Sequence, residues 1–133
     1  MATLTGQTIA EAQGAVRGLL DRTLAGSGMT SNEYVALRVA IARRAGDDLP
    51  RFLAGQPQLG LDAAGAADLV EGLRKRGLLV ENAITPAGAE LYERVAGRVA
   101  DATTRLYDGM DADDLATTQR VLTEVIARAA ADS

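Results

Sequence analysis

Hydrophobic residues recur at helical spacing in three long segments near the two ends of the chain. The first covers residues 7–25 and stops at Gly26-Ser-Gly28, the second runs from Pro86 to Gly109, and the third follows Asp111. Their apolar positions, which share one face of each predicted helix, are Ile9, Ala12, Val16, Leu19, Leu20, Leu24, Leu91, Val95, Val99, Ala102, Leu106, Leu115, Leu122, Val125, Ile126 and Ala129. This spacing predicts three amphipathic helices with these residues on their inward faces.

The segment between them predicts three shorter helices. Thr30-Ser-Asn-Glu33 matches the capping box, in which hydroxyl and carboxylate satisfy free backbone donors, so a helix is expected from there to the Arg-Arg-Ala-Gly of residues 43–46. A short helix over 49–53 follows, with Pro50 in its first turn. After a predicted loop at 55–60, Asp62 is placed to cap a helix over 63–76.

A very short β-hairpin is predicted next, although its turn residues are weak ones. Leu78–Val80 and Ala83–Ile84 are apolar and flank Glu81-Asn82, which is not a strong two-residue turn pair. Thr85-Pro86 then restarts helix as a cap followed by proline. Two short helices, a hairpin and a long helix form the order of a winged helix-turn-helix, so the predicted fold is mainly α with a minimal β-hairpin wing.

The composition restricts the chemistry. A chain of 133 residues, with 47% hydrophobic and 24% charged residues, suits one globular domain. It has no His and no Cys, which excludes a Ser-His-Asp relay, a thiolate nucleophile and the usual zinc ligand sets. No glycine-rich phosphate-binding motif occurs, and the acidic run 111–114 lacks the glycine and distal Glu of a calcium loop, so it is interpreted as a helix cap. We expect no enzyme activity, no cofactor and no metal.

Two further absences concern location. The N-terminus has no basic and apolar stretch of the signal-peptide type, and no apolar run approaches the roughly 18 residues of a membrane span. A cytoplasmic protein with no membrane partner is therefore expected.

Several short motifs, in this order, resemble the MarR family of bacterial transcription regulators (multiple antibiotic resistance regulators). They are Met29-Thr30-x-x-Glu33-Tyr34-x-x-Leu37, Leu53-Ala54, Leu59-Gly60-Leu61, Leu69-Val70, Leu73 with Arg74-Lys75-Arg76-Gly77-Leu78-Leu79, and Ile84-Thr85-Pro86-Ala87-Gly88-x-x-Leu91. The resemblance covers nearly the whole chain. It implies one MarR-like domain over 1–133, with a winged-helix lobe at 30–85 and dimerisation helices at 1–28 and 86–133. It also implies a homodimer that binds double-stranded DNA and that a small aromatic ligand regulates.

The resemblance assigns a DNA-binding surface to the helix over 63–76 and its neighbours. The candidate residues are Arg51, Ala63, Ala64, Ala67, Asp68, Arg74 and Lys75. The chain departs from the family here, because alanine offers only a methyl contact and Asp68 repels phosphates. The wing is also a short acidic stub that cannot insert an arginine into the minor groove. In a chain of net charge −4, Arg74 and Lys75 also fit a second role, as helix C-terminal cations.

By the same analogy Tyr34, Arg38 and Tyr92 line the ligand pocket, although each also fits a core or boundary position. Two functions are thus open. The first is a DNA-binding dimeric regulator. The alternative is a degenerate MarR-like dimer that has lost DNA binding and acts as a ligand- or protein-binding module.

Overall fold

The structure, a computed structural model, describes residues 3–43 and 48–132. The elements in chain order are α1 (Gly6–Leu24), α2 (Ser31–Arg43), α3 (Leu49–Ala54), the 3-10 turn η1 (Pro57–Leu59), α4 (Ala63–Lys75), β1 (Leu79–Val80), β2 (Ala83–Ile84), α5 (Pro86–Tyr107) and α6 (Ala112–Ala131). This order confirms the predicted mainly helical fold with a two-stranded hairpin. The chain forms two compact units, Met1–Ala102 and Thr103–Ser133.

Side-chain caps start most of these helices, as the sequence predicted. In the capping box, Glu33 N–H donates to the Thr30 hydroxyl (3.1 Å) and Thr30 N–H donates to the Glu33 carboxylate (2.8 Å). Single-residue caps are formed by Thr5, Asp48, Asp62, Thr85 and Asp111. The Asp111 cap confirms that the acidic run 111–114 begins a helix. Residues 44–47, which include most of the predicted Arg-Arg-Ala-Gly end of the second helix, lie outside the described part of the chain.

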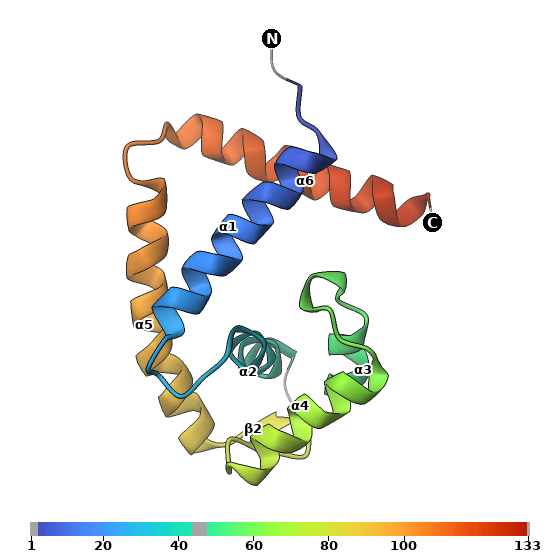
Figure 1. Ribbon diagram of the computed structural model, residues 1–133, viewed down its shortest axis with the longest axis vertical. Coiled ribbons are helices and arrows are strands. Elements are labelled where there is room, and N and C mark those ends of the chain that lie inside the picture. Colours follow the sequence, from blue (N-terminus) through green and yellow to red (C-terminus); the bar gives the residue numbers. More distant parts are fainter. Residues whose placement is uncertain (1–2, 44–47, 133) are drawn as a thin grey trace. The chain divides into compact units, whose positions relative to one another are not determined.

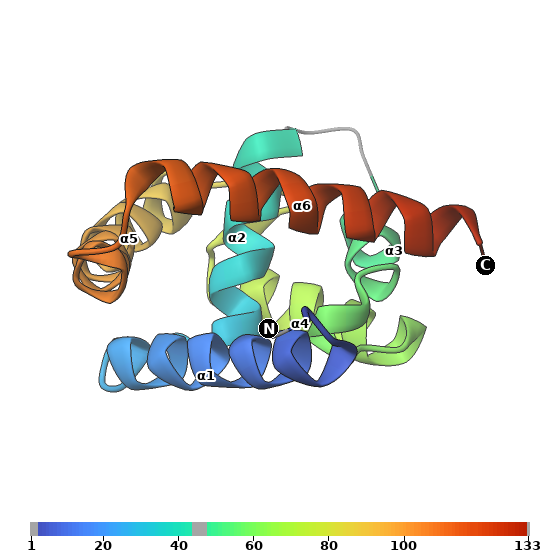
Figure 2. The same cartoon turned by 90° about the horizontal axis from the view of Figure 1, so that it is seen from above.

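The core of the first unit lies where α2, α3, α4 and β1 meet. In both views α2 lies between α5 on one side and α3 on the other (Figures 1 and 2). The largest fully buried side chains are Leu37, Leu53, Val70, Leu73 and Leu79. The segment 55–60, predicted as a loop, contains η1, because Leu59 turns inward and is buried.

The hairpin is as short as predicted, with Leu79 paired to Ile84 and Val80 to Ala83. Its two-residue turn places Glu81 at a φ of 55°, in the left-handed region that an L residue rarely adopts. The start of α5 packs closely behind the hairpin. A Cβ at Gly88 would lie 2.3 Å from the carbonyl oxygen of Leu78, so this position accepts only glycine without a backbone shift.

Two of the predicted inward faces are only partly covered within the single chain. In α1 only Leu24 is buried, while Ala12 and Val16 are exposed. In α6 no residue is buried, and the exposed fraction of Ile126 reaches 70%. The physical reason is size, since a unit of 103–133 has too little chain to cover an apolar helix face.

Candidate nucleic-acid interface and ligand site

The first two turns of α4 are open to solvent on one side. The N-cap carboxylate of Asp62 accepts a hydrogen bond from Gly65 N–H over 2.7 Å. On the inward side Ala66, Val70 and Leu73 are buried, which anchors the helix in the lobe. The predicted base-reading residues are all exposed, and these are Ala63, Ala64, Ala67 and Asp68. Methyl groups can contact thymine methyls and a carboxylate can accept from cytosine, but this face has no donor for guanine.

Arg51 lies on α3, which packs against α4. The side chain of Asp48 caps α3 by accepting a hydrogen bond from the backbone N–H of Arg51 (3.1 Å). The Arg51 side chain is exposed and forms no ion pair among residues 3–43 and 48–132. A guanidinium in this position is available for a phosphate contact.

The Arg74 side chain forms hydrogen bonds with the turn of the wing. Its Nε donates to the carbonyl oxygen of Glu81 (2.8 Å), and its terminal nitrogens donate to Asn82 Oδ1 (3.3 Å) and Glu71 Oε2 (3.4 Å). The guanidinium therefore satisfies the carbonyl at the strained turn position. Sequence reasoning assigned this residue to DNA or to the helix dipole and missed its contact with the turn, which no local motif marks.

The two basic residues after Arg74 differ in their surroundings. Arg76 donates to Glu33 Oε2 (3.0 Å) and to the carbonyl oxygen of Gly28 (2.9 Å), and so ties the end of α4 to the start of α2. Lys75 is exposed and has no hydrogen bond or ion pair within the described residues. Of the candidate cations, Arg51 and Lys75 are thus the two whose charges pair with no other residue among 3–43 and 48–132.

A polar network that sequence reasoning missed joins α1, α2 and η1. Arg17 donates to Asn32 Oδ1 (2.7 Å), and its Nε lies 3.7 Å from Asp21 Oδ1. The buried Ser31 hydroxyl donates to the same Asp21 oxygen, and Asn32 Nδ2 donates to the carbonyl oxygen of Leu59 (3.3 Å). This network fixes the end of α1 against the lobe that carries α4.

The three predicted ligand-binding residues lie close together. The rings of Tyr34 and Tyr92 stack with centroids 5.1 Å apart and planes 16° from parallel, joining α2 to α5. Tyr34 is buried, Tyr92 is half-buried and Arg38 is exposed one helical turn after Tyr34. Burial, with a smaller contribution from the hydrogen bond and charge of Tyr92, raises the pKa of Tyr34 to about 12, while the charge of Arg38 opposes this rise.

The described residues contain neither a candidate metal site nor a candidate membrane-spanning helix. Within residues 3–43 and 48–132, no three acidic side chains gather in a way that would hold a metal ion. No helix in the same residues combines the length and apolar character needed to cross a membrane.

No protein-family model and no curated protein matches the chain. Solved structures do match it. A MarR-family transcriptional regulator from a Rhodococcus species is 25% identical, with a TM-score of 0.78 over 93% of this chain and 95% of that chain. CouR from Rhodococcus jostii, bound to p-coumaroyl-CoA, is 25% identical, with a TM-score of 0.77 over 90% and 89% of the two chains.

A third match carries DNA. A MarR-family protein from Mycobacterium tuberculosis, in complex with DNA, is 20% identical, with a TM-score of 0.71 over 92% of this chain and 98% of that chain. At this identity the likeness concerns the fold alone. The chain is thus a MarR-like winged-helix protein, and the solved structures that it resembles are MarR-family transcriptional regulators.

Proposed function

We propose that the protein is a dimeric DNA-binding transcription regulator of MarR type. The observation that carries this proposal is the exposed face of α4, where Ala63, Ala64, Ala67 and Asp68 reach solvent while the other face is anchored in the lobe. A helix held in this way enters the major groove in winged-helix proteins, with its first turns at the base edges. As a dimer, two such helices meet a pseudo-palindromic operator and block or open a promoter.

Apolar side chains that the chain leaves uncovered support the proposal of a dimer. Exposed large hydrophobic residues occur near the N-terminus and around the turn and helix at the C-terminus: Leu4, Val16, Leu106, Tyr107, Met110, Val125 and Ile126. Apolar patches of this kind mark contact with a partner. In the MarR family, which the sequence resembles, that partner is a second copy of the chain. We therefore assign residues 1–28 and 86–133 to the dimer interface.

We infer from the family resemblance that a small aromatic ligand binds beside Tyr34 and Tyr92. Stacked rings offer a flat surface to a further aromatic group, and the exposed Arg38 supplies a positive charge at its edge. CouR, one of the structural neighbours, binds p-coumaroyl-CoA, a ligand with an aromatic acyl group. Because the stack joins α2 to α5, a ligand there would shift the lobe relative to the helix that leads to the dimer interface, and so move the two α4 helices apart.

One observation favours the alternative, a MarR-like dimer that no longer binds DNA. The exposed charges on α4 and the wing that pair with no other described residue are Asp68 and Glu81 against Lys75, because Arg74 pairs with Glu71 and is bonded to the turn. Carboxylates facing phosphates weaken association, and DNA-binding proteins normally present a basic patch. In this second function the same dimer binds a ligand or another protein. Neither function requires a catalytic group or a cofactor, and both place the protein in the cytoplasm.

Fluorescence anisotropy of the full chain with a generic labelled DNA duplex, at several salt concentrations, tests the proposal. A DNA-binding protein releases counterions whatever the sequence, so its affinity falls linearly with salt on a log–log plot, with a slope of about −0.9 for each phosphate contacted. We expect weak, salt-sensitive binding. No association at the lowest salt, with a dimer confirmed by light scattering, would reject DNA binding and support the binding module.

A further inference from the structure

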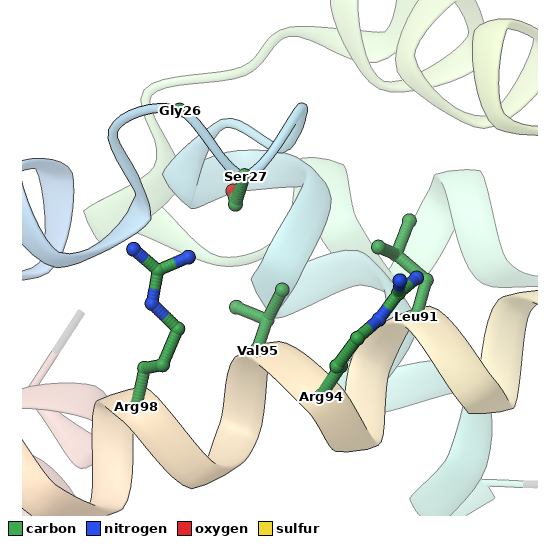
Figure 3. Close-up of a pocket in the computed structure, with 6 residues that line it drawn as sticks. All are labelled: Gly26, Ser27, Leu91, Arg94, Val95 and Arg98. Carbon is green, nitrogen blue, oxygen red and sulfur yellow. The ribbon is translucent and has the colours of Figure 1, made fainter.

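A pocket of about 220 Å³ lies between the turn after α1 and one side of α5, both within the unit Met1–Ala102. Its lining residues are Gly26, Ser27, Leu91, Arg94, Val95 and Arg98. Figure 3 shows Arg94 and Arg98 rising from α5 toward the turn on either side of Val95, with Ser27 across the pocket. In the sequence, Gly26 and Ser27 mark the end of the first helix and Leu91 and Val95 belong to an apolar stripe, whereas no motif marks the two arginines.

The charges of these two arginines are unpaired within the described part of the chain. They are one helical turn apart, both exposed, and neither forms a hydrogen bond or an ion pair with any described residue. By contrast Arg17, Arg74 and Arg76 each pair with a carboxylate. Like charges four residues apart destabilise a helix. A bound anion would neutralise this pair.

The rest of the lining suits an anion that carries an apolar group. Val95 is buried and Leu91 is half-buried, so they form an apolar floor between the arginines. On the opposite side the Ser27 oxygen accepts a hydrogen bond from Met29 N–H (3.2 Å), which leaves the hydroxyl hydrogen to donate to a ligand.

The pocket is separate from the aromatic stack. Successive residues of a helix are about 100° apart, so Arg94 lies roughly 200° round α5 from Tyr92. Tyr92 faces the core and Tyr34, whereas Arg94 and Arg98 face the turn at Gly26. A ligand of one site therefore does not occupy the other.

We propose that this pocket binds a small organic oxyanion, a phosphate or carboxylate group on a short apolar body. Its oxygens accept hydrogen bonds from the guanidinium groups of Arg94 and Arg98 and from the Ser27 hydroxyl, and its apolar part rests on Leu91 and Val95. Guanidinium groups match oxyanions in charge and geometry. The volume is below the roughly 300 Å³ of pockets for drug-sized ligands, which restricts the occupant to a small molecule.

Isothermal titration calorimetry of the full chain with phenyl phosphate, benzoate and uncharged benzyl alcohol tests this site. We expect at least one of the two anions to bind and the alcohol not to bind. The anion that binds more tightly shows whether the site prefers a phosphate or a carboxylate group. Each arginine removed should weaken binding about tenfold or more, since charge-assisted hydrogen bonds are lost, so Arg94→Gln with Arg98→Gln should abolish measurable binding. Arg94→Lys with Arg98→Lys should retain part of the affinity, because the positive charges remain.

The matched control is Arg51→Gln with Lys75→Gln, which removes the same charge from exposed positions outside the pocket and outside the segments assigned to the dimer interface. It should bind the anion as the unchanged protein does. Binding of neither anion to the unchanged protein would overturn the proposal, as would equal loss in both double variants. If circular dichroism shows that the double glutamine variant does not fold, the anion affinities of the double lysine variant and of the control variant still test the site. DNA binding does not enter this test, so its outcome is independent of the proposed function.

Discussion

The ring of Tyr34 stacks on the ring of Tyr92 and thereby joins α2 of the winged-helix lobe to α5. Tyr34 is buried while the guanidinium one turn later, that of Arg38, is exposed. The phenol group thus lies in a desolvated position at the junction through which we propose that a ligand acts. Its titration reports on this junction directly.

Stability should fall at high pH because of Tyr34. The pKa of its phenol rises from 10.0 to about 12 in the folded chain, so above pH 10 the unfolded state releases this proton first. The contribution of Tyr34 to the free energy of unfolding is fully present below pH 10 and is lost as pH rises toward 12. Urea unfolding across this range should show the fall, and Tyr34→Phe should reduce it. Tyr107→Phe, at an exposed tyrosine, is the control; if both variants respond to pH alike, Tyr34 is not the group responsible.

Alanine substitutions at two glycines of α5 should change the stability of the fold in opposite directions. A Cβ at Gly88 meets the Leu78 carbonyl oxygen at 2.3 Å, whereas a Cβ at Gly97 meets nothing within 4 Å. We expect Gly88→Ala to destabilise the fold by about 2 kcal/mol or more, because backbone must shift. Gly97→Ala should stabilise it by up to about 1 kcal/mol through helix propensity. Urea denaturation measures both, and a Gly88→Ala variant of unchanged stability would contradict the close packing of α5 on the hairpin.

Arg74 and Lys75 should separate into a structural and a DNA-contacting cation. Arg74→Gln loses the bonds to the wing turn, so it should lower the free energy of unfolding by about 0.5–1.5 kcal/mol for each hydrogen bond lost and leave the salt slope of DNA binding unchanged. Lys75→Gln should change stability little and make that slope less negative by about 0.9. The reverse result would return Arg74 to the DNA surface.

The dimer should depend on the exposed apolar face of α6. Ile126→Asp places a carboxylate in the proposed interface, where burial without a partner is costly. Light scattering at micromolar concentration should then give 13.8 kDa for the variant and twice that mass for the unchanged chain. Ala127→Asp, one residue further round the same helix, is the control and should remain a dimer. A monomeric unchanged chain at every concentration would reject the dimer.

Local signals in the sequence predicted the elements, and long-range contacts decided the details of the site. Thr30-x-x-Glu33, Asp62 and Thr85 mark helix starts because a cap acts within three residues of itself. Arg76 pairs with Glu33 across 43 residues, and no spacing rule connects two such positions. Only the folded chain likewise places Arg94 and Arg98 opposite the turn at Gly26.

The sequence could not predict how far the apolar faces are covered, for a related reason. The period of apolar residues in α6 identifies an amphipathic helix, but it carries no information on which surface covers that helix. Leu115 and Leu122 are half-buried, and Ile126 is open. A single chain can bury an apolar stripe only where its own elements reach it.

The salt dependence of DNA binding by Asp68→Arg tests most directly whether α4 meets DNA. The substitution is at an exposed position in the first turns of α4 and replaces a phosphate-repelling group with a phosphate-binding one. Asp108→Arg makes the same charge change at an exposed position outside the lobe and serves as the control. In anisotropy titrations with a generic duplex, Asp68→Arg should bind more tightly at low salt, with a log–log slope more negative by about 1 to 2, and the control should match the unchanged protein. A folded, dimeric Asp68→Arg variant with the slope of the unchanged protein would contradict the account, because α4 would then not approach DNA.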